Sequence, residues 1–318
     1  MKKFLVIAVS GVFALGIAAC GDDEDENGGG SSSGGGGDLS GTIRVDGSST
    51  VAPLTESAAE LFQAENPDVR VTVGTSGTGG GFEKFCAGET DISDASRAIE
   101  EDETALCKKG GIGYEEIQVA NDGLTVVVNP SNDFTSCLTV EELKKIWEPK
   151  SKVNNWNQVK SDFPDLEMEL FGAGTDSGTF DYFTEAINGE EGASRTDYNA
   201  TEDDNVTVQG VQGSEGGIGY FGLSYAEQNP DAVKPVEVDG GDGCVAASAE
   251  TVQDGTYKPL SRPLFIYPKA ESLERPEVKA FVEFYLENQD TIAEQALFVP
   301  LTDKQLTKSQ DAVAALAG

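Results

Sequence analysis

The sequence predicts an α/β protein in which helices flank mostly parallel β-strands. Three observations favour this class. The chain has 318 residues, enough for two domains, and its 38% hydrophobic and 25% charged composition is ordinary for a globular protein. Predicted strands and helices alternate along the chain. The apolar run 123–128, which ends just before Pro130, is typical of a strand buried on both faces.

The alternation begins in the first third of the chain. Residues 42–46 and 69–74 have the composition of strands, and a third short strand is predicted at 91–93. A helix is predicted between the first two strands, and Pro67 marks its end. Apolar side chains recur at helical spacing in both predicted helices of this region: Leu54, Ala58, Leu61 and Phe62 in the first, Phe82 and Phe85 in the second.

The same alternation continues toward the C-terminus. Thr139, followed three residues later by Glu142, is typical of a helix that starts with a capping box. Another helix follows Ser177, because Phe180, Phe183 and Ile187 fall on one helical face. The remaining predictions are strands at 123–128, 167–171, 217–221 and 262–268, and helices at 139–147 and 277–288.

The N-terminus has the features of an export signal. Lys2 and Lys3 precede the apolar run 4–19, which is too short for an ordinary membrane span. Its end, Ile-Ala-Ala-Cys at 17–20, resembles a bacterial lipobox, in which the cysteine becomes the lipidated first residue. We therefore predict a lipoprotein signal peptide over 1–20 with a lipid on Cys20. An ordinary secretory signal with a chance cysteine is the alternative.

A linker follows the predicted lipidation site. Residues 21–40 are acidic and rich in glycine and serine, a composition that cannot build a hydrophobic core. Such a segment behaves as a flexible tether. A tether behind an anchored cysteine suits a domain that works beside a membrane partner.

The cysteine count also favours export. Without Cys20 four cysteines remain, an even number that indicates two disulfides in an exported protein. Sequence proximity favours Cys86–Cys107, which leaves Cys137–Cys244. A zinc site would need close Cys-x-x-Cys spacing, which is absent. Buried free thiols remain an alternative.

Charge and composition exclude several function classes. The net charge of −34 argues against nucleic-acid binding, which needs a basic face. The chain has no histidine, so a Ser-His-Asp triad, a histidine base and histidine-ligated metals are all excluded. We therefore expect neither an enzyme nor a metal or other cofactor.

Three turns rich in Ser, Thr and Gly each precede a predicted helix: 48–51, 76–81 and 176–179. Free N–H groups and a positive dipole end make a helix N-terminus an anion site, and hydroxyl groups add donors. One such turn alone is more often a simple helix cap. Three converging turns would bind an anion with neutral donors even though the whole molecule repels anions.

Three charged residues are further candidates. Asp94 follows a predicted short strand. A carboxylate there would accept a proton from protonated phosphate but would leave a buried acceptor unpaired beside sulfate. Arg97 comes next in the chain, and a planar guanidinium suits oxyanions. Arg195 is the second cationic candidate. The alternatives are that Asp94 caps a turn or pairs with Arg97, and that the arginines are surface residues.

The motifs DGSSTV, TSGTGGGFEKFCAGETDISDASR and GTDSGTFDYF resemble those of the phosphate-binding proteins of bacterial Pst ABC transporters, and the similarity runs from about Gly41 to nearly the end of the chain. The resemblance implies a type II periplasmic-binding-protein fold, with two lobes and a hinge of two crossing strands. Carried over by motif, the phosphate ligands would be Thr50, Val51, Ser76, Asp94, Ser177, Gly178 and Thr179, with Ser49 as a possible addition.

One position departs from that family pattern. Well-known members have an arginine four residues before the serine of Ser-Gly-Thr, where this chain has Ala173. We therefore expect the charged donor to come from Arg97, with Arg195 as second choice. We expect lobe I to comprise 41–121 and 262–318 and lobe II to comprise 122–261, each with a central mostly parallel sheet.

The predicted function follows from this site. We expect an extracytoplasmic lipoprotein, monomeric and held to the membrane by its lipid, that captures inorganic phosphate between the lobes and delivers it to an ABC permease. The first alternative is a receptor for another oxyanion such as sulfate or molybdate. A secreted phosphatase or a purely structural surface protein are the others.

Overall fold

The computed structural model of the protein describes residues 39–316. The predicted signal segment 1–20, the predicted lipidation site Cys20 and nearly all of the linker 21–40 lie outside the described residues. Among residues 39–316, none of the helices combines the length and the apolar character needed to cross a membrane.

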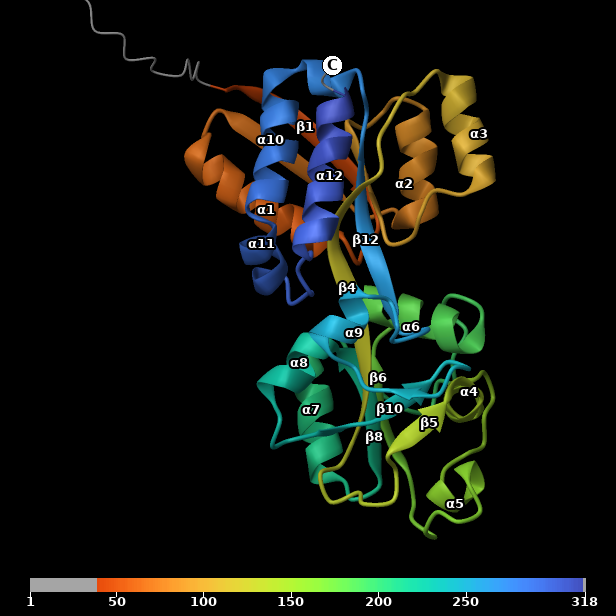
Figure 1. Ribbon diagram of the computed structural model, residues 1–318. Helices are drawn as coiled ribbons and strands as arrows, with labels where there is room; N and C mark the ends of the chain where they lie inside the picture. Colours follow the sequence, from red (N-terminus) through yellow and green to blue (C-terminus); the bar gives the residue numbers. More distant parts are fainter. Residues whose placement is uncertain (1–38, 317–318) are drawn as a thin grey trace, which may run out of the picture. The chain divides into compact units, whose positions relative to one another are not determined.

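The described chain is a mixed α/β protein, as predicted (Figure 1). Its strands are β1 (Gly41–Gly47), β2 (Val69–Gly74), β3 (Ile92–Ala95), β4 (Ile117–Val128), β5 (Cys137–Thr139), β6 (Glu169–Ala173), β7 (Asn199–Thr201), β8 (Gly217–Gly222), β9 (Lys234–Pro235), β10 (Glu237–Asp239), β11 (Cys244–Val245) and β12 (Ser261–Pro268).

Helices separate most of these strands. They are α1 (Ala52–Glu65), α2 (Gly77–Cys86), α3 (Glu101–Gly110), α4 (Val140–Trp147), α5 (Trp156–Val159), α6 (Gly178–Asn188), α7 (Asp204–Gly213), α8 (Leu223–Gln228), α9 (Ala249–Gln253), the 3₁₀ turn η1 (Ser272–Glu274), α10 (Pro276–Glu287), α11 (Gln289–Gln295) and α12 (Asp303–Leu316).

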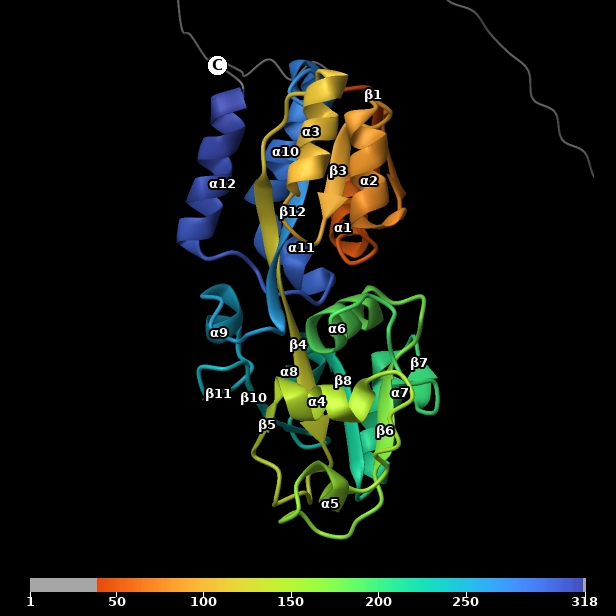
Figure 2. The same ribbon diagram turned by 90° about the vertical axis from the view of Figure 1, so that its right-hand side faces the viewer.

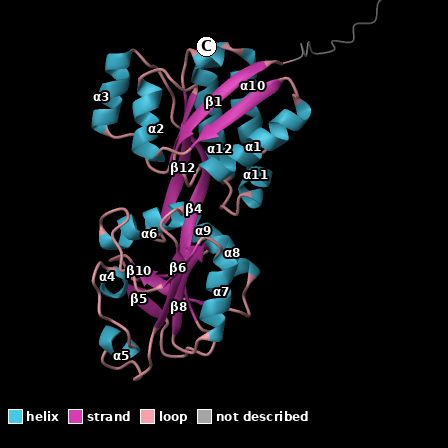
Figure 3. Cartoon of the chain, turned by 180° about the vertical axis from the view of Figure 1, so that it is seen from behind, coloured by secondary structure: helices cyan, strands magenta, loops and turns pink. Residues whose placement is uncertain are grey.

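Two lobes share one sheet, whose strand order is β2-β1-β3-β12-β4-β8-β6-β7, with β9 beside β4. Figure 3 shows β12 and β4 running between the two lobes. β1, β2 and β3 pair in parallel, and so do β6, β7 and β8. The strands β4 and β12 run antiparallel to their neighbours. The first half of β4 pairs with β12 and its second half, Leu124–Val128, pairs with β8. Because β4 is long enough to serve both lobes, the two predicted sheets are joined into one.

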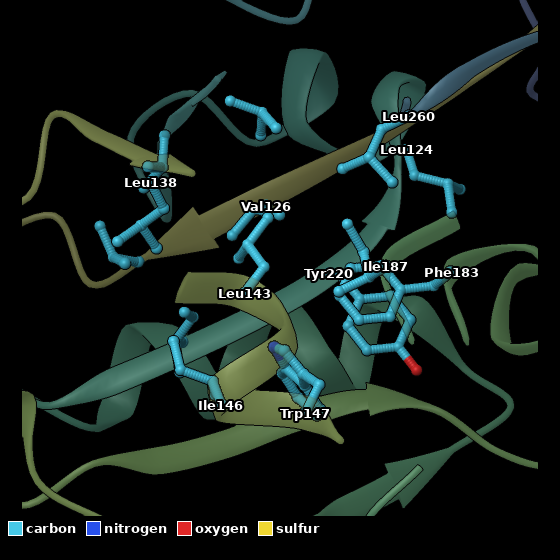
Figure 4. Packing of buried hydrophobic residues seen from close by; sticks show 14 of the residues in the cluster. Leu124, Val126, Leu138, Leu143, Ile146, Trp147, Phe183, Ile187, Tyr220 and Leu260 are labelled. Atoms are coloured by element: carbon cyan, nitrogen blue, oxygen red, sulfur yellow. The ribbon is translucent and has the colours of Figure 1, made fainter. Parts of the chain in front are cut away.

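Each lobe has its own hydrophobic core. We call β1–β3 with α1–α3 and α10–α12 lobe I, and β5–β11 with α4–α9 lobe II. In lobe I, α1 and α10 pack together, and the rings of Phe62 and Phe281 lie 5.4 Å apart. In lobe II, Phe183 stacks on Tyr220 at 3.7 Å, and Trp147 meets the edge of that pair (Figure 4). Separate cores allow each lobe to move as one body.

Two strands connect the lobes, and a third segment, which leaves lobe I and returns to it, packs beside them. β4 and β12 run side by side from one lobe to the other (Figure 1). The third segment is 297–301, between α11 and α12 of lobe I, which we call the strap. Its Val299 packs in the core of lobe II and exchanges two backbone hydrogen bonds with Asn121 of β4, at 2.8 and 3.0 Å. On its other side, Asn121 is paired with Pro263 of β12.

Most predicted elements are present, with two informative differences in length. β2 spans 69–74, as predicted, and the capping box of α4 joins Thr139 and Glu142 in both directions. β3 is longer than predicted, since it continues through Ala95. β4 starts at Ile117, because the polar residues Gln118, Asn121 and Asp122 lie within the strand and bind partners there.

Both predicted disulfides are present, the one favoured by sequence proximity and the one that remained. Cys86–Cys107 joins α2 to α3 in lobe I, and Cys137–Cys244 joins β5 to β11 in lobe II. Glu237 lies close to the second pair. Those two sulfur atoms are bonded to each other, so they are not available as thiolate ligands for a metal.

Candidate anion-binding site

A polar pocket of about 240 Å³ lies between lobe I and lobe II. Figure 2 shows α6 of lobe II below the end of lobe I that carries α1 and α2. The pocket is lined by Ser48, Ser49, Thr50, Ser76, Gly77, Thr78, Gly79, Gly80, Ser96, Arg97, Asp181, Tyr182, Glu185, Glu191 and Arg262.

The first turn is built by the residues between β1 and α1. The Ser48 hydroxyl accepts from Thr50 N–H at 3.2 Å, and the Ser48 carbonyl accepts from Ala52 N–H at 3.0 Å, which starts the helix. Pro53 lies in the first turn of α1, where no N–H is needed. Within the described chain, the N–H groups of Ser49 and Val51 have no acceptor. They are free donors beside the pocket, which Ser49 and Thr50 line.

The second turn precedes α2. α2 approaches β1 very closely: a Cβ on Gly81 would lie 2.5 Å from the Cα of Gly47, so only glycine fits there. Ser76 lines the pocket, but its hydroxyl donates to Asp46, which also binds Lys84 at 2.6 Å. To donate to a bound ion, the Ser76 hydroxyl must therefore leave Asp46.

The third turn brings lobe II against lobe I. Ser177 is the N-cap of α6, and its hydroxyl accepts from Thr179 N–H at 3.2 Å. A Cβ on Gly178 would lie 2.5 Å from Thr50 Oγ1 and 3.0 Å from Thr50 N, so the bare backbone of Gly178 packs on Thr50. Ser177, Gly178 and Thr179 do not line the pocket, although Asp181, Tyr182 and Glu185 of the same helix do. The N–H of Gly178 has no acceptor in the described chain.

Asp94 does not line the pocket. Because β3 extends past it, Asp94 lies inside the sheet, paired with Gly47 and Ile266, and its side chain is fully buried. Neither carboxylate oxygen has a hydrogen-bond partner. Burial raises the pKa of Asp94 to about 8, and the nearby Thr55 hydroxyl opposes that shift. The carboxyl group is therefore mostly protonated at neutral pH, and its assignment as proton acceptor for phosphate stays a prediction. Ser96, two residues later, lines the pocket instead.

Arg97 lines the pocket, but its charge is already matched. It binds Glu103 through two nitrogens, each at 2.8 Å, and Nε lies 3.3 Å from Glu100. Nη1 also donates to the Ala98 carbonyl at 3.2 Å. Glu103 raises the pKa of Arg97 further. All three nitrogens of this guanidinium have protein partners.

Arg195 is not brought to the pocket. Only 4% of its side chain is exposed, and it lies in lobe II. Its Nη1 donates to the carbonyls of Ile146 and Val153 at 3.0 and 2.7 Å, and Asp197 takes the other two nitrogens. These bonds hold α4 to the following loops, which is a structural role.

Arg262 is the pocket residue that sequence reasoning missed. It lies near the start of β12, where the sequence pattern predicts a strand but no site residue. Its Nε donates to Asp122 of β4 at 3.1 Å and its Nη2 donates to Thr50 Oγ1 at 3.0 Å. The ring of Tyr182 covers its guanidinium at 3.6 Å. An arginine at the start of a mostly apolar strand was the available signal, since such a charge is buried only with partners.

Acidic side chains form the lobe II side of the pocket: Asp181, Glu185 and Glu191. Burial, followed by the charge of Glu191, raises the pKa of Asp181 to about 6. This wall repels a fully deprotonated anion and accepts hydrogen bonds from a protonated one.

Comparisons with known proteins agree with this geometry. A family model described as a PBP superfamily domain matches residues 32–289. Protein SphX of Synechococcus elongatus is 49% identical over 268 residues, which cover 83% of this chain and 79% of that protein. The phosphate-binding protein PstS of Staphylococcus saprophyticus is 41% identical over 313 residues, covering 98% of this chain and 94% of that protein.

Solved structures of phosphate-binding proteins also resemble this chain. The crystal structure of a possible phosphate-binding protein from Planctomyces limnophilus matches with a TM-score of 0.84 and 49% identity, covering 88% of this chain and 100% of that one. An ABC-type phosphate transport receptor from Vibrio cholerae, 23% identical with a TM-score of 0.65, covers 81% of this chain and 99% of its own and shares the fold. The chain therefore belongs to the PstS family of phosphate-binding proteins, within the periplasmic-binding-protein superfamily.

Proposed function

We propose that this protein captures inorganic phosphate in the pocket between its lobes and delivers it to the permease of an ABC transporter. The observation that carries the proposal is the meeting of helix starts from both lobes at one polar pocket, where Gly178 of α6 packs on Thr50 before α1. Free N–H groups at these starts, together with the hydroxyls of Ser49, Thr50 and Ser76, would bind the oxygens of one tetrahedral ion.

Neutral donors explain how so acidic a chain can bind an anion. The net charge of −34 repels anions at long range, but salt screens that field beyond about 8 Å. Inside the pocket, the N–H and O–H dipoles at the helix starts attract an oxyanion without needing an excess of positive charge. The local site then outweighs the charge of the whole molecule.

The acidic wall of the pocket favours phosphate over sulfate. Asp181, Glu185 and Glu191 can accept a proton from monohydrogen or dihydrogen phosphate. Sulfate has no proton to donate at neutral pH, so these acceptors would face it unpaired and repel it. Glu185 and Glu191 are exposed and Asp181 is partly buried, so this discrimination is smaller than the one that fully buried acceptors give.

Binding would favour the closed arrangement of the lobes. Donors at 49–51 and 76–80 belong to lobe I, and donors at 177–179 belong to lobe II. Only an arrangement with both sets near the ion makes all of the bonds, so phosphate would shift the population toward it. The permease would then recognise the closed form.

The anchor completes the proposal. A lipid on Cys20 and the acidic, Gly/Ser-rich linker 21–40 would hold the monomeric receptor near the membrane on the extracytoplasmic side. Labelling of growing cells with radioactive palmitate checks this part: we expect label on the wild-type protein and none on Cys20→Ser. Label on both variants, or on neither, would contradict the anchor without touching the ligand.

Isothermal titration calorimetry tests the ligand. After removal of bound phosphate by an enzymatic scavenger, the purified protein is titrated with phosphate, arsenate and sulfate. We expect saturable binding of phosphate and none of sulfate, and phosphate at 100 times the Kd should stabilise the fold by about 2.7 kcal/mol. Equal binding of sulfate would support the alternative oxyanion receptor. Turnover of a phosphate ester in the same preparation would support a phosphatase.

A further inference from the structure

Arg262 stands at the centre of the molecule. β12, which carries it, and β4, which carries Asp122, are the two strands that join the lobes, and the register pairs Arg262 directly with Asp122. From that position the side chain contacts Thr50 of lobe I at 3.0 Å and lies 3.6 Å from the ring centre of Tyr182 in lobe II. One arginine thus contacts both lobes and the strand between them.

The arginine is held in one orientation. Its side chain is 13% exposed and that of Asp122 is 6% exposed, so solvent screens this ion pair little. The Tyr182 ring covers one face of the guanidinium, and the Tyr182 hydroxyl is itself fixed by donation to the Pro259 carbonyl at 2.8 Å. A guanidinium group fixed in this way loses little conformational entropy when it binds a ligand.

Part of the guanidinium group is free. Nε binds Asp122 and Nη2 binds Thr50, but Nη1 has no acceptor in the part of the chain that the structure describes. Arg97, by contrast, has a protein partner on each of its three nitrogens, including two carboxylates. Of the two arginines that line the pocket, Arg262 is therefore the one with a nitrogen available to donate to a bound ion.

We propose that Arg262 is the charged ligand of the bound oxyanion, taking the role that the family gives to an arginine where this chain has Ala173. The proposal rests on the proposed function, and it replaces Arg97 and Arg195 as the source of the charge. It also places the cation on the hinge rather than on either lobe. An ion that binds Arg262 and the N–H groups of both lobes holds the hinge and both lobes in one arrangement.

Calorimetry on Arg262→Gln tests the assignment. Loss of a charged, oriented donor should weaken phosphate binding by about 100-fold, and Arg262→Lys should recover part of it, since the charge returns without the planar guanidinium group. Arg97→Gln is the competing variant, and we expect a loss below about threefold, because its donors bind glutamates. Arg70→Gln, on the exposed face of β2, removes the same charge far from the pocket and serves as the matched control.

A second variant protects the test against misfolding. Arg262→Gln leaves Asp122 buried without its partner, which can destabilise the fold. The double variant Arg262→Gln with Asp122→Asn removes that buried charge, and it should melt near the wild type without ligand yet still bind phosphate about 100-fold more weakly. Binding by this double variant within threefold of the wild type overturns the proposal, as does a 100-fold loss in Arg97→Gln. Failure of the wild type itself to bind phosphate would instead overturn the proposed function.

Discussion

The two lobes contribute to the pocket in opposite ways. Lobe I presents two helix starts, before α1 and α2, with the hydroxyls of Ser49, Thr50 and Ser76. Lobe II presents one helix start, where Gly178 packs on Thr50, and an acidic wall that includes Asp181. In the proposed site, most hydroxyl donors and the charged donor would therefore come from lobe I and the hinge. Lobe II would add the N–H groups at the start of α6, acceptors for a protonated ligand and the exclusion of water.

The largest expected effect comes from spoiling the contact between the lobes. A Cβ at residue 178 would meet Thr50 Oγ1 at 2.5 Å, so Gly178→Ala must push lobe II away from the ion. Loss of the lobe II bonds should weaken phosphate binding by about 100-fold with little change in ligand-free stability. Calorimetry and thermal melting measure the two quantities.

Gly213→Ala is the control for that variant. Gly213 lies in α7 of lobe II, and a Cβ there meets nothing within 4 Å. We expect this change to leave phosphate affinity at the wild-type value. If Gly178→Ala also binds normally, lobe II does not close on the ligand through α6, and the contrast between the lobes is wrong.

The next effect concerns Asp94, which is buried in the lobe I part of the sheet, and the dependence of folding stability on pH. In the folded protein the pKa of Asp94 is raised to about 8, whereas an unfolded aspartate titrates near 3.8. Between these pH values the folded state binds a proton that the unfolded state lacks, so the contribution of Asp94 to stability falls as pH rises. Asp94→Asn does not titrate, and between pH 5 and 7 its stability relative to wild type should rise by on the order of 2 kcal/mol.

Urea unfolding of both proteins at pH 5, 6, 7 and 8 measures this difference. Calorimetry on the same variant tests the role suggested by the family resemblance, because a buried structural Asp94 should leave discrimination between phosphate and sulfate intact. Loss of that discrimination in Asp94→Asn would show that the carboxyl group reaches the ion after all. If the free energies of unfolding of wild type and Asp94→Asn change with pH in the same way, the raised pKa of Asp94 is wrong.

The smallest effect is expected for Ser76→Ala. The Ser76 hydroxyl donates to Asp46 in this structure, so binding the ion exchanges one hydrogen bond for another. We expect phosphate affinity to fall by about threefold, less than for a hydroxyl without a protein acceptor. Calorimetry decides this as well. A loss near 100-fold would make Ser76 a principal ligand and shift the balance within lobe I toward α2.

Local sequence patterns predicted the parts of the site that depend on local structure. Each of the turns at 48–51, 76–81 and 176–179 precedes a helix, as glycine, hydroxyl and apolar spacing indicated. The α/β class followed from the alternation of elements. The disulfide Cys86–Cys107 followed from sequence proximity, and Cys137–Cys244 remained by elimination.

Two features could not be predicted, because they depend on distant pairing. Asp94 lies within the sheet and not in the pocket lining because β3 continues to Ala95, and that length is set by pairing with β1 and β12 rather than by local composition. Arg262 meets Asp122 across 140 residues of sequence, through the register of β4 and β12. No local pattern reports such a register.

The strap beside β4 has a consequence for how the cleft opens. Asn121 is flanked by Pro263 on one side and by Val299 on the other, so β12, β4 and the strap lie side by side between the lobes, like a ribbon. A ribbon flexes readily across its flat face and stiffly along its width, where hydrogen bonds would have to stretch. We therefore expect bending across the flat face of these three segments to be the easiest motion of one lobe against the other.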